Sequence, residues 1–101
     1  MERLTRNKKK ILEALLAVAP DGDLSPSQIS AAEGIASGSL YPALRDLRND
    51  ELVETEWRSP DGDEQPRRYY RLTPDGVLLA RAVEAGTIKG TSWRLLLGGD
   101  P

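Results

Sequence analysis

The sequence predicts a mainly α-helical fold with one small β-hairpin, and three observations support this prediction. Apolar residues recur at helical spacing in the first half of the chain, and turn-forming residues divide this half into three segments. Two strand-like runs follow, Leu52–Trp57 and Arg67–Leu72, with turn formers between them. A further helical pattern begins after Thr73. A helix followed by a hairpin with basic residues is the layout of a winged helix-turn-helix.

The composition limits the classes of function that the chain can have. With 101 residues, 39% of them hydrophobic, it can form one small domain with a modest core. It contains no cysteine and no histidine, which removes disulfides, thiol catalysis, and the commonest metal ligand and general base. The sequence also lacks a glycine loop that could cradle phosphates. We therefore expect neither an enzyme nor a metal or cofactor site.

No segment of the sequence resembles a membrane span or a signal peptide. The apolar runs are far shorter than the roughly 20 residues that cross a bilayer. The basic start, Arg3–Lys10, leads into an amphipathic pattern that includes Glu13, without a signal-peptide core or a cleavage site. These features predict a soluble, cytoplasmic protein that does not contact a membrane.

Two helices are expected before residue 34. The first covers Thr5–Ala19, because apolar residues recur there at helical spacing until turn formers at 20–23 end the pattern. The second covers Pro26–Glu33. Ser25 and Gln28 form a capping box at its start, and proline is well tolerated at the first helical position.

The third helix is expected over Ser39–Asp50. The preceding connection, 34–38, contains Ile35, which can enter the core, and either Ser37 or Ser39 can cap the helix. Three leucines at spacings of four and three define an inward face, and polar residues occupy the other face. The leucines are Leu40, Leu44 and Leu47, and the outer face holds Ser39, Pro42, Arg45, Asp46 and Asn49.

The hairpin should have one buried and one exposed face. Alternation places Val53, Thr55 and Trp57 on one side of the first strand, and Glu54 and Glu56 on a solvent-facing side. Trp57 is expected to be a hydrophobic plug under this hairpin, which is the wing of the predicted fold. In the second strand the adjacent Tyr69 and Tyr70 point to opposite faces, so at least one should pack in the core. The tip between the strands is acidic and rich in turn formers.

The charge distribution favours local contact with nucleic acid over general coating of it. The net charge is -2 and the pI is near 5.1, so bulk charge cannot provide affinity for phosphate. The cations nevertheless cluster in three groups, and most acids lie elsewhere. The groups are Arg3, Arg6 and Lys8–Lys10; Arg45 and Arg48; and Arg67, Arg68 and Arg71.

The chain is expected to divide into a winged helix-turn-helix at residues 1–72 and a C-terminal helical dimerisation segment at 73–101. From Leu79 to Leu97, apolar residues and glycines recur at spacings of four and three, which is the pattern of a two-helix seam. The alternative is a break near Gly86–Gly90 and a short second helix that carries Trp93. In either case we expect burial against a second subunit. The expected interface residues are Leu79, Val83, Trp93, Leu96 and Leu97.

Several of these segments together resemble the PadR family of transcriptional regulators. The resemblance extends over roughly residues 10–85, and the combination of motifs is more specific than any one of them. The matching segments are Gly38–Leu47, Leu52–Glu54, Trp57 and Arg68–Thr73, together with Gly76. The resemblance implies a dimeric winged-helix repressor with its third helix in the DNA major groove. It also implies a small aromatic effector at the dimer interface, for which Trp93 would be the probe.

Two features depart from the family pattern. The second helix is short and lacks the usual Gly-Tyr-x-Leu opening. Members of the family also usually carry glycine where this chain has Glu51. The left-handed residue after the third helix must therefore be supplied by Asn49 or Asp50, or be tolerated with some strain.

The candidate DNA contacts follow from the dimensions of the major groove, which admits a helix whose N-terminal residues reach the bases. Arg45, one turn along the third helix, could read guanine or grip a phosphate, and we favour phosphate. Tyr41 either contacts DNA or packs beside the wing. The lysine run is either a set of backbone contacts or simply a solvated helix start. The candidates are Lys8, Lys9, Lys10, Ser37, Ser39, Tyr41, Pro42, Arg45, Arg67 and Arg68.

The sequence and its resemblance to the PadR family together predict a sequence-specific DNA-binding regulator, a repressor that binds a pseudo-palindromic duplex as a homodimer. The alternative is a winged helix that contacts protein and has no sequence-specific DNA binding, for which the acidic balance is the supporting feature. The two hypotheses differ in whether one double-stranded DNA sequence is preferred over others.

Overall fold

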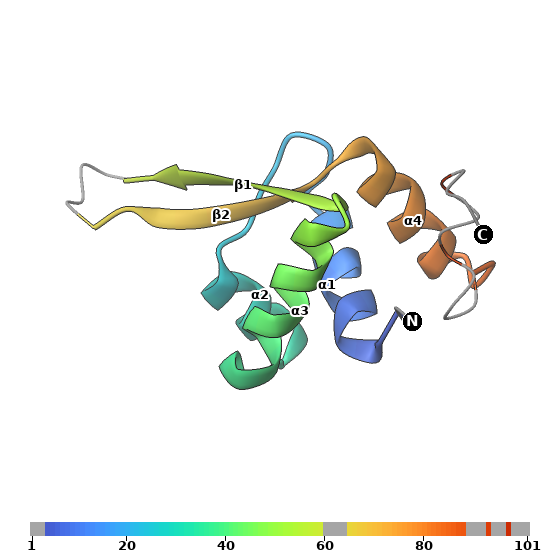
Figure 1. Cartoon of the computed structure of the whole chain (residues 1–101), viewed down its shortest axis with the longest axis horizontal. Coiled ribbons are helices and arrows are strands. Elements are labelled where there is room, and N and C mark those ends of the chain that lie inside the picture. Colours follow the sequence, from blue (N-terminus) through green and yellow to red (C-terminus); the bar gives the residue numbers. More distant parts are fainter. Residues whose placement is uncertain (1–3, 60–64, 89–92, 94–96, 98–101) are drawn as a thin grey trace.

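The computed structural model describes residues 4–59, 65–88, 93 and 97. Within them, the helices are α1 (Arg6–Leu16), α2 (Pro26–Glu33), α3 (Ser37–Asn49) and α4 (Pro74–Glu84). The strands β1 (Val53–Arg58) and β2 (Arg67–Leu72) pair antiparallel. Figure 1 shows the hairpin projecting from the body formed by the helices. The predicted fold class, mainly α with a small hairpin in a winged helix-turn-helix order, is confirmed.

A single core lies between the helices and the base of the hairpin. The three leucines of α3 point inward as predicted, and Ile35 enters the core from the connection between α2 and α3. From the hairpin, Tyr70 is buried, whereas Tyr69 is half-buried, so one of the two tyrosines packs in the core as expected. The core residues include Ile11, Leu12, Leu15, Ile29, Leu40, Leu44, Leu47, Leu52 and Leu79.

The ends of α1 and α2 show which local sequence signals were sufficient to predict where a helix begins and ends. The bounds of α2 are as predicted, and its capping box is present, with Ser25 and Gln28 each satisfying a backbone N–H of the other. Helix α1 ends at Leu16, earlier than predicted, because the chain tightens into turns in which the Val18 N–H donates to the carbonyl of Leu15. The last turn of the predicted helix is therefore irregular.

Helix α3 starts two residues earlier than predicted. Its N-cap is Ala36, which makes no side-chain hydrogen bond, so the prediction that Ser37 or Ser39 caps the helix is wrong. Both serines lie in the first turn instead, where their side chains are exposed. The extended backbone of Ala36 is sufficient to start the helix, and its carbonyl accepts from the Leu40 N–H at 2.9 Å.

The left-handed position after α3 belongs to Glu51 itself, which has a φ of 59°. Neither Asn49, which is helical, nor Asp50 takes this role, so that part of the prediction is wrong. The conformation is held from two sides. The Leu52 N–H donates to the carbonyl of Leu47 at 3.0 Å, and the Thr73 hydroxyl donates to the carbonyl of Glu51 at 2.7 Å. The chain therefore tolerates a side chain where glycine would be unstrained.

Glu51→Gly is expected to raise the free energy of unfolding by about 0.5–1 kcal/mol, because the relief of left-handed strain exceeds the entropy gained by the unfolded chain. Urea denaturation would measure the change. Glu51→Ala is the control, since it removes the carboxylate but keeps the Cβ atom that causes the strain. A stabilisation in the alanine variant equal to that in the glycine variant would contradict the argument.

The C-terminal segment does not form one long helix. Helix α4 ends at Glu84, and Gly86 adopts a left-handed φ of 72°, so the predicted seam from Leu79 to Leu97 is interrupted. The break near Gly86 that the alternative predicted is confirmed, whereas its short second helix lies largely outside the described residues. Gly90 and Leu96 lie outside the described residues.

The predicted dimer residues are partly used within the chain. Leu79 is fully buried, and Trp93, only 3% exposed, belongs to the same core as α1 and α3, so neither needs a second subunit for its burial. Val83 and Leu97 are half-buried against this core. The division of the chain at residue 72 stays a prediction, and α4, which follows this point, packs on α1 within the same core. No helix in the described ranges has the length and apolar character needed to cross a membrane.

Candidate nucleic-acid interface

Helix α3 presents an exposed face that carries five of the predicted contact residues, four of them in its N-terminal half. Tyr41 is 55% exposed, and the guanidinium of Arg45 lies in solvent with only a weak pairing to Asp46, at 3.6 Å. This face is exposed because the leucines fix the rotation of the helix about its axis. The five residues are Ser37, Ser39, Tyr41, Pro42 and Arg45.

The wing places an aromatic ring and an arginine on the side of the hairpin that continues from the core. In the strand register, Trp57 is opposite Arg68, and the guanidinium of Arg68 lies 4.8 Å from the centre of the Trp57 ring. Trp57 is 59% exposed, so the prediction of a hydrophobic plug under the wing is wrong. The reason is its position in the register, beyond Tyr70, where the hairpin has already left the core.

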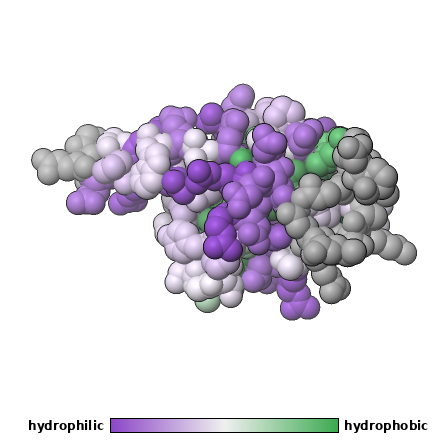
Figure 2. All heavy atoms as spheres, viewed as in Figure 1, coloured by the Kyte–Doolittle hydropathy of each residue, from purple (hydrophilic) through white to green (hydrophobic). Residues whose placement is uncertain are grey.

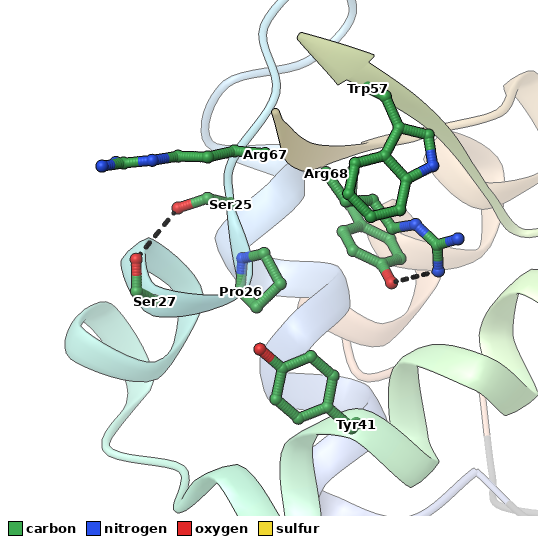
Figure 3. Close-up of a pocket in the computed structure, with 8 residues that line it drawn as sticks. Ser25, Pro26, Ser27, Tyr41, Trp57, Arg67 and Arg68 are labelled. Atoms are coloured by element: carbon green, nitrogen blue, oxygen red, sulfur yellow. Dashed lines mark hydrogen bonds between the residues drawn. The ribbon is translucent and has the colours of Figure 1, made fainter. Parts of the chain in front are cut away.

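A groove of about 440 Å³ lies between the start of α2, the exposed face of α3 and the wing. Tyr41 lines one side and Trp57 and Arg68 the other, as Figure 3 shows. Tyr41 thus borders the wing groove while it remains largely accessible. The lining residues are Ser25, Pro26, Ser27, Tyr41, Trp57, Arg67, Arg68 and Tyr70.

Arg68 is the cation best placed to bind an anionic group in this groove. Its Nη1 donates to the hydroxyl of Tyr70 at 3.4 Å, a long bond that leaves most of the guanidinium donors to other partners. Its Nε is buried and makes no hydrogen bond within the described part of the chain. Arg67 also lines the groove, but Figure 3 shows its side chain extending away from Trp57 and Arg68.

The opposite face of the hairpin is internally neutralised. Arg71 donates to Glu54 at 2.7 Å and to Glu56 at 3.2 Å, so these glutamates, although exposed as predicted, are paired. Arg58 forms a bidentate pair with Asp23, at 2.6 and 2.9 Å. The hydrogen bonds from Arg58 lower the pKa of Asp23, partly opposed by burial, so this carboxylate stays ionised at neutral pH. Arg58 and Arg71 of this face are therefore occupied by carboxylates.

The lysine run at the start of α1 is not uniform. The side chain of Lys8 is only 11% exposed, and its Nζ lies 3.6 Å from a carboxylate oxygen of Asp46 on α3. Lys9 and Lys10 are half-exposed. Lys8 therefore joins α1 to α3, and only its two neighbours remain candidates for contact with a phosphate backbone.

Sequence reasoning did not include Ser25, Ser27 and Trp57 among the site residues. Ser25 was interpreted only as part of a capping box, and Ser27 was given no role. Their hydroxyl oxygens lie 3.2 Å apart, and both serines line the groove. For Trp57, the alternation of side chains along a strand was a partial signal, because it fixes which residues of β1 share a face with Trp57. Only the register between the strands adds Tyr70 and Arg68 to that face. The register itself could not be read from the strands alone.

An exposed third helix beside an arginine- and aromatic-lined wing groove defines a winged helix-turn-helix protein. The model of the "Transcriptional regulator PadR-like family" matches residues 27–82, which is more than half of the chain. The chain belongs to this family of transcriptional regulators.

Solved structures with the same fold include members of a second group of regulators. ZitR of Lactococcus lactis, described as a zinc-responsive MarR family member, is 23% identical with a TM-score of 0.67 over 81% of this chain and 52% of its own. MepR of Staphylococcus aureus, described as a regulator of the multidrug efflux pump MepA, is 25% identical with a TM-score of 0.66, over 82% of this chain and 57% of its own.

A mutant of MepR bound to an oligodeoxyribonucleotide is also similar, with 25% identity and a TM-score of 0.67 over 80% of this chain and 56% of its own. The chain thus spans little more than half the length of these proteins. A search of curated protein sequences gave no match.

Proposed function

We propose that this chain is a sequence-specific DNA-binding transcriptional repressor that binds a pseudo-palindromic duplex as a homodimer in the cytoplasm. The observation that carries the proposal is the exposed N-terminal face of α3, which borders the same groove as Arg68 of the wing. A duplex that receives α3 in its major groove would meet the wing at the adjacent backbone. The similarity to a MepR mutant bound to an oligodeoxyribonucleotide supports this arrangement.

Each part of the surface has a different role in the proposal. The start of α3, with Ser37, Ser39, Tyr41 and Pro42, lies closest to the base edges, and Arg45 follows one turn later. Arg67 and Arg68 of the wing contact the adjacent phosphates, and Lys9 and Lys10 add backbone contacts. Lys8 is left out because its side chain is buried against Asp46.

The homodimer gives two copies of α3 related by a two-fold axis, which is the reason for expecting a pseudo-palindromic site. The half-buried Val83 and Leu97 remain candidates for the interface. A small aromatic effector at that interface stays a prediction. Trp93, which is buried in the core, would report such binding only through a change in packing.

Selection of bound fragments from a random duplex library at near-physiological salt tests the proposed function. The wild-type protein is expected to enrich a motif with two-fold symmetry. If Arg45 contacts phosphate, Arg45→Ala should weaken binding without changing the motif. If Arg45 reads guanine, the variant should lose the base preference at one position of the motif, at a cost of about 1–3 kcal/mol in binding free energy. Arg81→Ala is the matched control, because Arg81 is an exposed arginine on α4, outside the groove.

The two outcomes separate the candidate functions. A motif that is enriched by the wild type and Arg81→Ala, but degraded or weakened in Arg45→Ala, supports reading by α3. A folded protein that enriches no duplex contradicts the proposal and favours a winged helix used for protein contact. The pairing of Glu54 and Glu56 with Arg71 is evidence against that alternative, since these acids already have basic partners.

A further inference from the structure

The outer half of the wing receives little support from the hydrophobic core. Among the hairpin residues, the core includes only Val53, Tyr70 and Leu72, all from the inner half. Outward from Tyr70 the described side chains are exposed or half-buried, and Figure 2 shows this part standing away from the body with a mainly polar surface. Its direction relative to α3 must therefore be set by polar contacts.

The loop between α1 and α2 supplies such contacts. Leu24 forms a bridge with Tyr70, in which each N–H donates to the carbonyl of the other, at 2.9 and 2.8 Å. The preceding residue, Asp23, accepts both hydrogen bonds from Arg58, which lies at the outer end of β1. The Arg58 guanidinium also lies over the ring of Tyr69 on β2, 4.0 Å from its centre.

These three side chains form a diagonal brace across the hairpin, which we call the Asp23–Arg58 brace (Asp23, Arg58 and Tyr69). It starts on the outer end of one strand, crosses the other strand and ends on a loop of the helical body. The side chain of Asp23 is only 15% exposed, so the pair is partly protected from water. A bidentate arginine–carboxylate pair also fixes an orientation, because both hydrogen bonds form in only one relative geometry.

We propose that Asp23 is a positioning residue for DNA binding, which acts through Arg58 to hold the wing in the direction that keeps the groove open beside α3. The proposal rests on the proposed DNA-binding function. A wing that is ordered before binding spares the complex the entropy of ordering it, so the brace increases affinity without touching DNA. Asp23 pairs on the hairpin face that carries Arg58 and Tyr69, whereas Trp57 and Arg68 stand on the other face.

Electrostatics gives this proposal a sharp test, because the two possible effects of Asp23→Asn have opposite signs. The substitution changes the net charge from -2 to -1, which by itself would strengthen binding to polyanionic DNA. Loss of the brace would weaken binding. Glu56→Gln makes the same charge change on the same face. It leaves the bidentate pair in place, because Asp23 keeps both hydrogen bonds from Arg58 and Glu56 makes only a longer contact with Arg58, at 3.7 Å.

Binding is measured with the duplex obtained by selection, over a series of salt concentrations. Asp23→Asn is expected to bind about fivefold more weakly than wild type, with an unchanged salt slope because no phosphate contact is lost. Glu56→Gln should bind as tightly as wild type or more tightly. Asp23→Glu, which keeps a carboxylate, should recover part of the affinity.

A second measurement needs no DNA. Backbone ¹⁵N relaxation of β2 and the indole ¹⁵N signal of Trp57 should show larger fast motion of the wing in Asp23→Asn than in Glu56→Gln, with the helices unchanged. If Asp23→Asn binds as tightly as Glu56→Gln, or its wing is as ordered as that of wild type, the proposed role of Asp23 is wrong. If wild type selects no duplex, the proposed function fails, and the relaxation data still decide whether the brace orders the wing.

Discussion

Gly76→Ala is expected to lower the free energy of unfolding by about 2–3 kcal/mol, because the added methyl group would overlap the carbonyl oxygen of Leu52. This oxygen cannot easily move away, since it accepts the backbone N–H of Thr73 at 3.1 Å and thereby joins the start of α4 to the residue before β1. The side chain of Leu72 also lies close to the position of the added methyl group, so the group has no free space on that side either. Urea denaturation followed by circular dichroism measures the loss.

Gly38→Ala is the matched control for this experiment. Gly38 lies in the first turn of α3, and a Cβ atom there would meet no other atom within van der Waals range. The same substitution should therefore stabilise the fold, by about 0.5–1 kcal/mol, through the higher helix propensity of alanine. Equal effects of the two substitutions would show that contact with Leu52 is not what requires glycine at residue 76.

Arg68→Gln is expected to weaken binding of the selected duplex ten- to hundredfold, because a charged hydrogen bond contributes roughly 1.5–3 kcal/mol. If Arg68 contacts one phosphate, the slope of log affinity against log salt should also fall by about 1. The substitution shortens the side chain and removes the charge, but it leaves the backbone pairing of β1 with β2 in place. Affinity would be measured by fluorescence anisotropy at several salt concentrations.

The control for Arg68→Gln is Arg81→Gln, which makes the same charge change on α4 and should leave the salt slope as in wild type. Thermal unfolding of both variants separates a DNA contact from a structural role of the stack on Trp57. A loss of stability in Arg68→Gln with an unchanged salt slope would mean that Arg68 supports the wing without contacting phosphate.

The candidate site was predictable from the sequence where it depends on one helix. The exposed face of α3 follows from the spacing of its leucines, and so do the residues that α3 would present to DNA. The groove was not predictable, because Ser25, Tyr41 and Trp57 come from three elements whose contact depends on how the elements pack. The burial of Lys8 against Asp46 had the same origin, since it depends on how α1 lies against α3.

The sequence by itself determined the features that arise from neighbours within a few residues. The start of α2 follows from a capping box between two residues three positions apart, and the order of helices and hairpin follows from apolar periodicity and turn formers. These interactions form between groups that are already close along the chain, so their pattern can be read directly.

Only the tertiary structure decided the features that join distant segments. Glu51 adopts a left-handed conformation because Leu47 and Thr73 hold it from two sides, and the Asp23–Arg58 brace joins residues 35 positions apart. Trp93 enters the core while Trp57 remains in solvent, although both are equally apolar. The physical reason is that burial and pairing depend on which surfaces meet after the elements have packed, and residue type alone does not specify the partner.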